Sequence, residues 1–168
     1  MTHHARWLFT GITLAGFAAA TLAQDPIPRP QRSEHGQITV SPATAALIKQ
    51  AEAGDADAAN TVGFQYGNGL SVMQNDAEAL KWYRKAAELG SEKGMYHLAG
   101  VYENGYGVKQ DYQAAIKWYR KAAERGHVPA HHSLARLYEQ GQGVPKDLKQ
   151  SAEWRRKGEA LETHPHGK

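Results

Sequence analysis

The chain contains no cysteine, and its longest run of lysine and arginine is three residues, "RRK" at 155–157. The absence of cysteine excludes disulfides, thiolate catalysis and metal or iron–sulfur sites built on cysteine. Lysine and arginine number 20 against 17 aspartates and glutamates, for a net charge of +3. That excess is too small and too scattered for a nucleic-acid-binding surface. We therefore expect no nucleic-acid partner.

Long apolar runs are also scarce, and the prominent one lies at the start of the chain. Residues 8–23, "LFTGITLAGFAAATLA", are free of charge and follow Arg6. A basic start, an apolar stretch and small residues at its end are typical of a secretory signal peptide. We predict residues 1–23 as that peptide, cleaved after Ala23, and a periplasmic or secreted protein. The run is short for a membrane helix, so stable membrane insertion is not expected after cleavage; an uncleaved anchor is the alternative.

Two further segments are expected to stay outside the fold. Residues 24–40 begin "QDPIPRPQRSEHGQ", rich in proline and poor in apolar side chains. Such a composition cannot bury enough surface to order itself and predicts a flexible leader. The tail at 163–168, "THPHGK", is likewise expected to be disordered, with weak metal binding through its histidines as the alternative.

The rest of the chain is periodic. The octapeptide "KWYRKAAE" stands at 81–88 and again at 117–124, and an altered copy, "EWRRKGEA", follows at 153–160. The step is 36 residues in both intervals, and further columns keep it. These columns are Trp82, Trp118 and Trp154; Tyr66, Tyr102 and Tyr138; Gly69, Gly105 and Gly141; and Val62, Leu98 and Leu134. An internal period of this size indicates a repeat architecture.

Each repeat is predicted to contain two helices. In the second repeat, Met95, Leu98 and Tyr102 fall on one helical face. Ser91 can cap this first helix, and Asp111 can cap the second. The glycines of "GYGV" between the two helices suit a turn with positive φ. In the first repeat, Ser71 takes the place of the second turn glycine.

The pattern resembles the Sel-one-like repeat (SLR) family, a branch of the tetratricopeptide superfamily. The resemblance rests on the "GYGV" and "GQGV" turns, the aspartates seven residues before Trp118 and Trp154, and the run "KWYRKAAE". It implies an all-α fold, a short right-handed α-solenoid of about three helix-turn-helix repeats. It also implies an adaptor, scaffold or regulator that binds another protein or a peptide.

Both ends of the repeat array show capping features. Residues 41–54 begin with Ser41 and Pro42, a helix start, and resemble the second helix of a repeat. At the other end Arg155, Gly158 and Glu159 replace the tyrosine and two alanines of the octapeptide, as expected where no further repeat stacks. We therefore divide residues 41–162 into a cap helix (41–54) and repeats at 55–90, 91–126 and 127–162, seven helices in all. The mature protein is expected to be a monomer.

The partner site is predicted on the first helices of the repeats, which line the concave face of helix-pair solenoids. Next to their core stripe lies a column whose residues differ in kind between repeats. It contains Asn60, Phe64, Tyr96, Gly100, His132 and Arg136. Such variation suits the recognition of a non-repetitive ligand, although exposed positions free to vary would look the same.

No catalytic or cofactor constellation stands out, and we expect neither a catalytic residue nor a cofactor. His127, His131 and His132 are close in sequence, but Pro129 favours a helix start between them, so no metal site is predicted. An adaptor is therefore the favoured function. The alternatives are a cell-envelope hydrolase or a modulator of a cell-wall enzyme. A regulator of a sensor kinase or an effector acting on a host would fit the adaptor class equally well.

Overall fold

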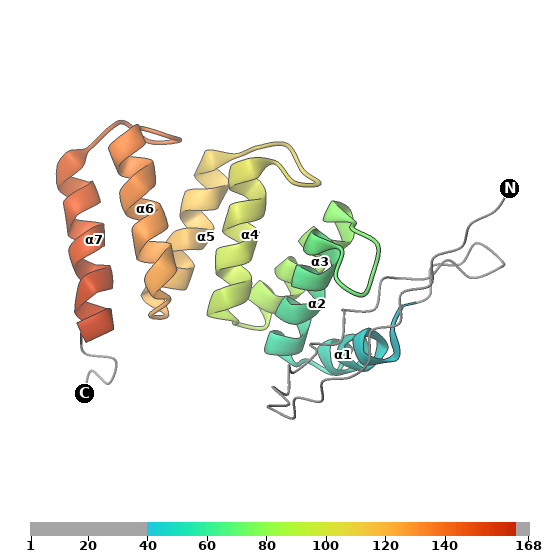
Figure 1. Ribbon diagram of the computed structural model, residues 1–168. Coiled ribbons are helices and arrows are strands. Elements are labelled where there is room, and N and C mark those ends of the chain that lie inside the picture. The colour runs from blue at the N-terminus through green and yellow to red at the C-terminus, as the bar shows by residue number, and fades with distance from the viewer. Residues whose placement is uncertain (1–39, 164–168) are drawn as a thin grey trace, which may run out of the picture.

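The computed structural model describes residues 40–163, and within them it contains seven α-helices and no strand. They are α1 (Pro42–Glu52), α2 (Ala56–Asn68), α3 (Asp76–Glu88), α4 (Glu92–Asn104), α5 (Tyr112–Glu124), α6 (Val128–Gln140) and α7 (Leu148–Thr163). Figure 1 shows them following one another from α1 at one end of the array to α7 at the other. The predicted all-α repeat fold is confirmed. The predicted signal peptide, nearly all of the leader and residues 164–168 lie outside the described residues.

The helix starts follow the polar side chains that the sequence places there. Ser41, Asp55, Ser91 and Asp111 each accept a hydrogen bond from a backbone N–H in the first turn. In the first repeat Asn75 takes the place of the aspartate and also caps the second helix. Its Oδ1 accepts hydrogen bonds from two backbone N–H groups at 3.1 Å. Each side chain satisfies N–H groups that the helix itself leaves without a partner.

The turns within the three repeats share one backbone geometry. Gly105, Gly107, Gly141 and Gly143 all have positive φ, between 65° and 74°. Ser71 adopts φ 62° at the position where the other repeats have glycine. The backbone N–H that precedes the second helix bonds to a tyrosine carbonyl in every repeat, at 2.8–2.9 Å. The predicted glycine turn is therefore present three times, with serine tolerated in the first.

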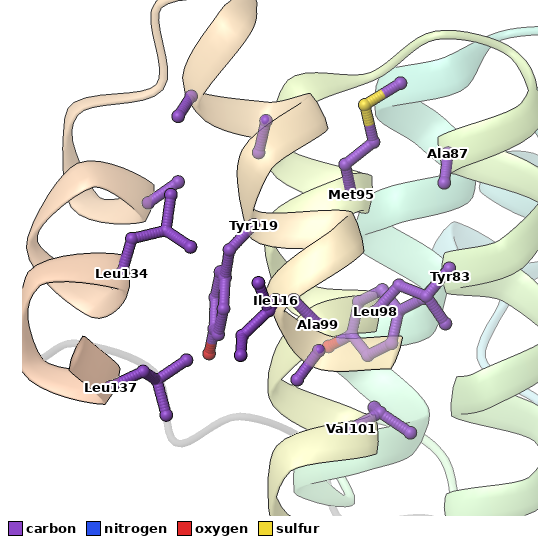
Figure 2. Close-up of a cluster of buried hydrophobic side chains, with 14 of the residues drawn as sticks. Tyr83, Ala87, Met95, Leu98, Ala99, Val101, Ile116, Tyr119, Leu134 and Leu137 are labelled. Atoms are coloured by element: carbon purple, nitrogen blue, oxygen red, sulfur yellow. The ribbon is translucent and has the colours of Figure 1, made fainter. Parts of the chain in front are cut away.

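The repeated apolar columns form the core. Val62, Leu98 and Leu134 are all 0% exposed, and Figure 2 shows residues of α4, α5 and α6 meeting around Tyr119. The small residues allow close helix approach: a Cβ on Gly94 of α4 would lie 2.5 Å from Cβ of Ala86 of α3.

The tryptophans differ in burial. Trp82 is buried among residues of α1 and α2. Trp118 and Trp154 are only half-buried, and Lys121 and Lys157 lie over their rings.

The C-terminal cap needs one correction. Arg155 and Glu159 are exposed on the outer face of α7, as predicted. Gly158 is buried instead, and a Cβ there would lie 3.1 Å from Cβ of His131. Its column faces the preceding helix, so glycine permits close packing there and is not part of the polar outer surface. None of the seven helices within residues 40–163 has the length and apolarity that crossing a bilayer requires.

Candidate functional site

A pocket of about 310 Å³ opens between α2 and α4, the first helices of the first two repeats. Helices α3 and α5 and the turn after α4 complete it. Its lining residues are Phe64, Gly67, Asn68, Asp76, Ala79, Tyr83, Tyr96, His97, Gly100, Val101, Asn104, Tyr106 and Tyr119. A hollow of about 600 Å³ lies along α5, but it is lined by that helix and its N-cap residue, mainly with charged side chains. The pocket between α2 and α4 differs from it in bringing together side chains of the first two repeats.

Five of the thirteen lining residues are phenylalanine or tyrosine. Phe64 and Tyr106 stand at its rim and are 43% and 55% exposed. Tyr83 and Tyr119 are buried below them. Large exposed aromatic side chains beside a cavity are costly to leave in water and favour a ligand with apolar surface.

The polar groups of the pocket are few. Asn68 and Asn104 occupy the same position in successive repeats, and each donates its amide at 2.8 Å to the backbone carbonyl four residues earlier. Asp76 is the carboxylate among the lining residues, which include no lysine or arginine. The backbone of Asp76 lies against the turn that carries Tyr106, since a Cβ on Gly107 would come within 2.8 Å of its carbonyl.

His97 lies at the inner side of the pocket. Its Nδ1 is 2.7 Å from Oδ1 of Asn60, and because an amide oxygen only accepts, this bond places a proton on Nδ1. Its ring lies 5.0 Å from that of Tyr83 and 5.6 Å from that of Tyr96, between centroids. Burial lowers the pKa of His97, and the nearby His127 lowers it further. The imidazole is therefore neutral at physiological pH and acts as a structural and hydrogen-bonding group.

The predicted site residues fall into two groups. Phe64, Tyr96 and Gly100 lie together in the pocket. Asn60 does not line it, because it is 9% exposed and its side chain is engaged with His97. Asn60, which was predicted to face the partner, is therefore used in a contact within the chain.

His132 and Arg136 lie outside the pocket, farther along the array. Nε2 of His132 is 3.4 Å from Glu162 of α7. Arg136 contacts the carboxylate of Glu103 at 2.5 Å and the side-chain oxygens of Gln140 and Gln142 at 3.3 and 3.2 Å. Both are thus engaged in contacts within the chain.

The sequence reasoning did not single out Asp76, His97, Asn68, Asn104 or Tyr106. His97 carried a usable signal, since its column contains Thr61, His97 and Ser133 and so varies between repeats. Tyr106 carried another, because a large aromatic between two turn glycines has no role in the turn itself. The asparagines were hidden because a repeated residue indicates packing more often than binding.

The histidines near Pro129 do not converge. His127 is the N-cap residue of α6, with no capping bond from its side chain. His131 is buried, with Nδ1 3.2 Å from the carbonyl of His127. Within residues 40–163 no three histidine, aspartate or glutamate side chains lie close enough to hold a metal ion.

The three repeats described above match one known protein family. The family model described as Sel1 repeat matches residues 56–91, 93–127 and 128–158. The chain belongs to the Sel1 repeat family. Sel1 repeat proteins are generally adaptors that mediate protein–protein interactions.

Solved Sel1 repeat structures resemble the chain closely. A protective antigen of uropathogenic Escherichia coli with an SLR fold is 37% identical, with a TM-score of 0.68 over 70% of this chain and 25% of its own. This chain therefore spans a quarter of that antigen. A Sel1 repeat protein from Oxalobacter formigenes is 29% identical, with a TM-score of 0.66 over 88% of this chain and 99% of its own.

The cysteine-rich protein B of Helicobacter pylori shares the fold. It is 24% identical, with a TM-score of 0.58 over 73% of this chain and 93% of its own. No curated protein matches the chain.

Proposed function

We propose that this chain is an exported adaptor that binds a peptide segment of another protein in the pocket between α2 and α4. The pocket carries the proposal. It is concave, it joins the first two repeats, and exposed aromatic rings surround a small set of polar groups. A concave, largely apolar pocket with a few convergent polar groups is the usual form of a ligand-binding site.

The asparagines support a peptide rather than a compact small molecule. Asn68 and Asn104 each use their amide N–H₂ in an intrahelical bond, which fixes the side chain and leaves its oxygen to accept from a ligand. Their spacing is that of the repeat, so two such acceptors lie side by side along the groove. An extended peptide presents N–H groups at regular intervals and could bond to both.

Export is the second part of the proposal and rests on residues 1–23. Their order of a basic start, an apolar stretch and small residues is that of a cleaved signal. The test is the mass of the protein recovered from the cell envelope or medium. A mass equal to that of a chain starting at Gln24 supports export with cleavage, whereas recovery of the intact chain in the cytoplasm contradicts it.

Binding is tested by affinity capture from an envelope extract. Phe64→Ala with Tyr106→Ala removes both rings from the rim of the pocket and should abolish capture of the specific partner. Leu148→Ala is the matched control, since Leu148 is 61% exposed but lies on α7, away from the pocket. If the folded double variant captures the same partner as well as the parent does, the pocket is not the binding site.

A further inference from the structure

The pocket has a counterpart one repeat further on, and the chain fills that counterpart with its own arginine. A shift of 36 residues takes Gly67 to Glu103, Gly100 to Arg136 and Tyr106 to Gln142. In the second interface the guanidinium of Arg136 contacts Glu103 at 2.5 Å and Gln142 at 3.2 Å. The place that is open between α2 and α4 is therefore occupied by a bound basic side chain between α4 and α6.

In the first interface both members of this ion pair are replaced by glycine. Neither glycine is needed for close packing: a Cβ on Gly67 would lie 3.6 Å from Ala79, and one on Gly100 would lie 3.7 Å from Tyr119, both ordinary contacts. Neither has positive φ. Gly63 shows the contrast, since a Cβ there would lie 2.8 Å from the ring of Tyr83. Glycine destabilises the interior of a helix, and neither packing nor backbone geometry requires it at Gly67 or Gly100. What these two glycines provide is the open space of the pocket.

The charge of the open pocket matches the group that fills its counterpart. Among the lining residues Asp76 is the one with a formal charge at neutral pH, since burial keeps His97 neutral. No lysine or arginine within residues 40–163 forms a salt bridge with Asp76. Phe64, Tyr96 and Tyr106 add ring faces, which attract cations.

We propose that the pocket between α2 and α4 binds the side chain of an arginine in an extended segment of a partner protein. Asp76 supplies the charge partner, the side-chain oxygen of Asn104 accepts an N–H as that of Gln140 does from Arg136, and the rings of Phe64 and Tyr106 flank the guanidinium. This inference rests on the proposed function and adds the chemistry of the ligand.

The first test uses small probes on the full chain. N-acetyl-arginine N-methylamide is titrated against the citrulline analogue, which has nearly the same shape but no charge, while the amide resonances of Gly67 and Gly100 are followed by NMR. The arginine probe should bind about tenfold more tightly than the citrulline probe, the scale of one charge-assisted contact. Equal binding of the two probes, or no binding of the arginine probe, overturns the proposal.

Asp76→Asn should remove most of this preference and leave the helical signal unchanged. Asp57→Asn is the control, because Asp57 also lies in the first turn of its helix but is exposed and outside the pocket. If Asp76→Asn keeps the full preference for arginine, Asp76 is not the charge partner and the proposal is wrong. If instead the N-methylamide of N-acetyl-leucine binds the pocket and the arginine probe does not, the basic ligand is excluded while the peptide-binding role stands.

A second variant fills the pocket with the ion pair that the chain itself uses at the next interface. Gly67→Glu with Gly100→Arg installs at the first interface the pair found at the second, and it should abolish binding of the arginine probe at an unchanged or higher melting temperature. Gly67→Ala with Gly100→Ala is the matched control, which strengthens both helices but leaves the cavity open and should retain binding. Parent-like binding by the folded, filled variant overturns the proposal.

Discussion

Tyr119 donates a 2.8 Å hydrogen bond to Glu103, and one repeat later Arg155 reaches Glu139, its counterpart, at 3.0 Å. The two columns are thus paired twice, with different chemistry. Tyr119 is 4% exposed beneath the third repeat, whereas α7 is the last helix described and Arg155 is exposed on it. The same position accordingly holds a buried tyrosine inside the array and an exposed cation at its end.

The outer face of α7 is therefore expected to prevent end-to-end association. Arg155→Tyr with Glu159→Ala restores the octapeptide at these two positions and exposes a stacking surface. We expect dimers or higher species at micromolar concentration, measured by size-exclusion chromatography with light scattering. Gly158 is left unchanged because it packs against α6.

Arg156→Tyr is the control for this experiment, since Arg156 is also exposed on α7 but belongs to another column. A double variant that remains as monomeric as the control would show that this face does not cap the array.

The bond between Tyr119 and Glu103 should contribute measurably to stability. Burial and the carboxylate of Glu103 both raise the pKa of Tyr119, so the hydroxyl stays protonated as the donor. Tyr119→Phe should lower the free energy of unfolding by about 1–3 kcal/mol, because it removes a buried bond to a charged group. Urea denaturation measures this.

Tyr102→Phe is the comparison variant, because the hydroxyl of Tyr102 only accepts an exposed bond from Arg84. It should cost less than about 1 kcal/mol. An equal loss in the two variants would contradict the special role of the bond to Glu103.

Much of the fold follows from local sequence signals. Each capping side chain, turn glycine and apolar column acts within one repeat or between neighbours, so periodicity alone determines the arrangement. The serine at position 71, in place of the turn glycine of the other repeats, is also explained by which residues lie next to it. Gly107 and Gly143 lie against Asp76 and Tyr112, each at the start of the second helix of the preceding repeat. The position 36 residues before Asp76, which would face Ser71, is Val40, and it precedes α1.

The pocket was harder to predict because it depends on what is missing. Phe64 and Tyr96 were recognisable as variable positions beside the core stripe. The cavity itself arises from Gly67 and Gly100, and a glycine within a helix carries no sign of whether it permits close packing or leaves a hole. Arg136 was expected in the groove, but its charge is used inside the chain because Glu103 stands opposite it. Pairing across repeats of this kind becomes visible only in three dimensions.

The turn glycines predict a contrast between repeats. Gly107→Ala should destabilise the protein by more than about 1–2 kcal/mol, since it combines positive φ with a Cβ 2.8 Å from the backbone of Asp76. Ser71→Gly should instead be neutral or stabilising by up to about 1 kcal/mol, because Ser71 holds a positive φ without glycine. Thermal unfolding of both variants checks this, and a loss on Ser71→Gly as large as that on Gly107→Ala would contradict it.

The buried histidines predict a loss of stability in mild acid. Burial is the main cause that lowers the pKa of His97, His127 and His131 below 6.5 in the folded chain. Below that value the unfolded chain binds more protons than the folded one. The stabilising contribution is therefore complete above about pH 6.5 and is lost as the pH falls through the folded-state pKa values.

Melting temperatures at pH 7.5 and pH 5.5 test this. The parent should melt at a lower temperature at pH 5.5. His97→Ser, which introduces the residue found at the equivalent position 133, should show a smaller drop. A melting temperature that is unchanged or higher in acid would contradict the burial of these neutral side chains.

Site-specific photo-crosslinking in the producing cells tests the central claim most directly, that the pocket between α2 and α4 is the partner site. A photoreactive phenylalanine analogue is placed at Phe64, at Tyr106 or at the exposed Leu148 of α7. We predict the same partner adduct from positions 64 and 106 and none from position 148. An adduct from position 148, with none from 64 or 106, would contradict the account.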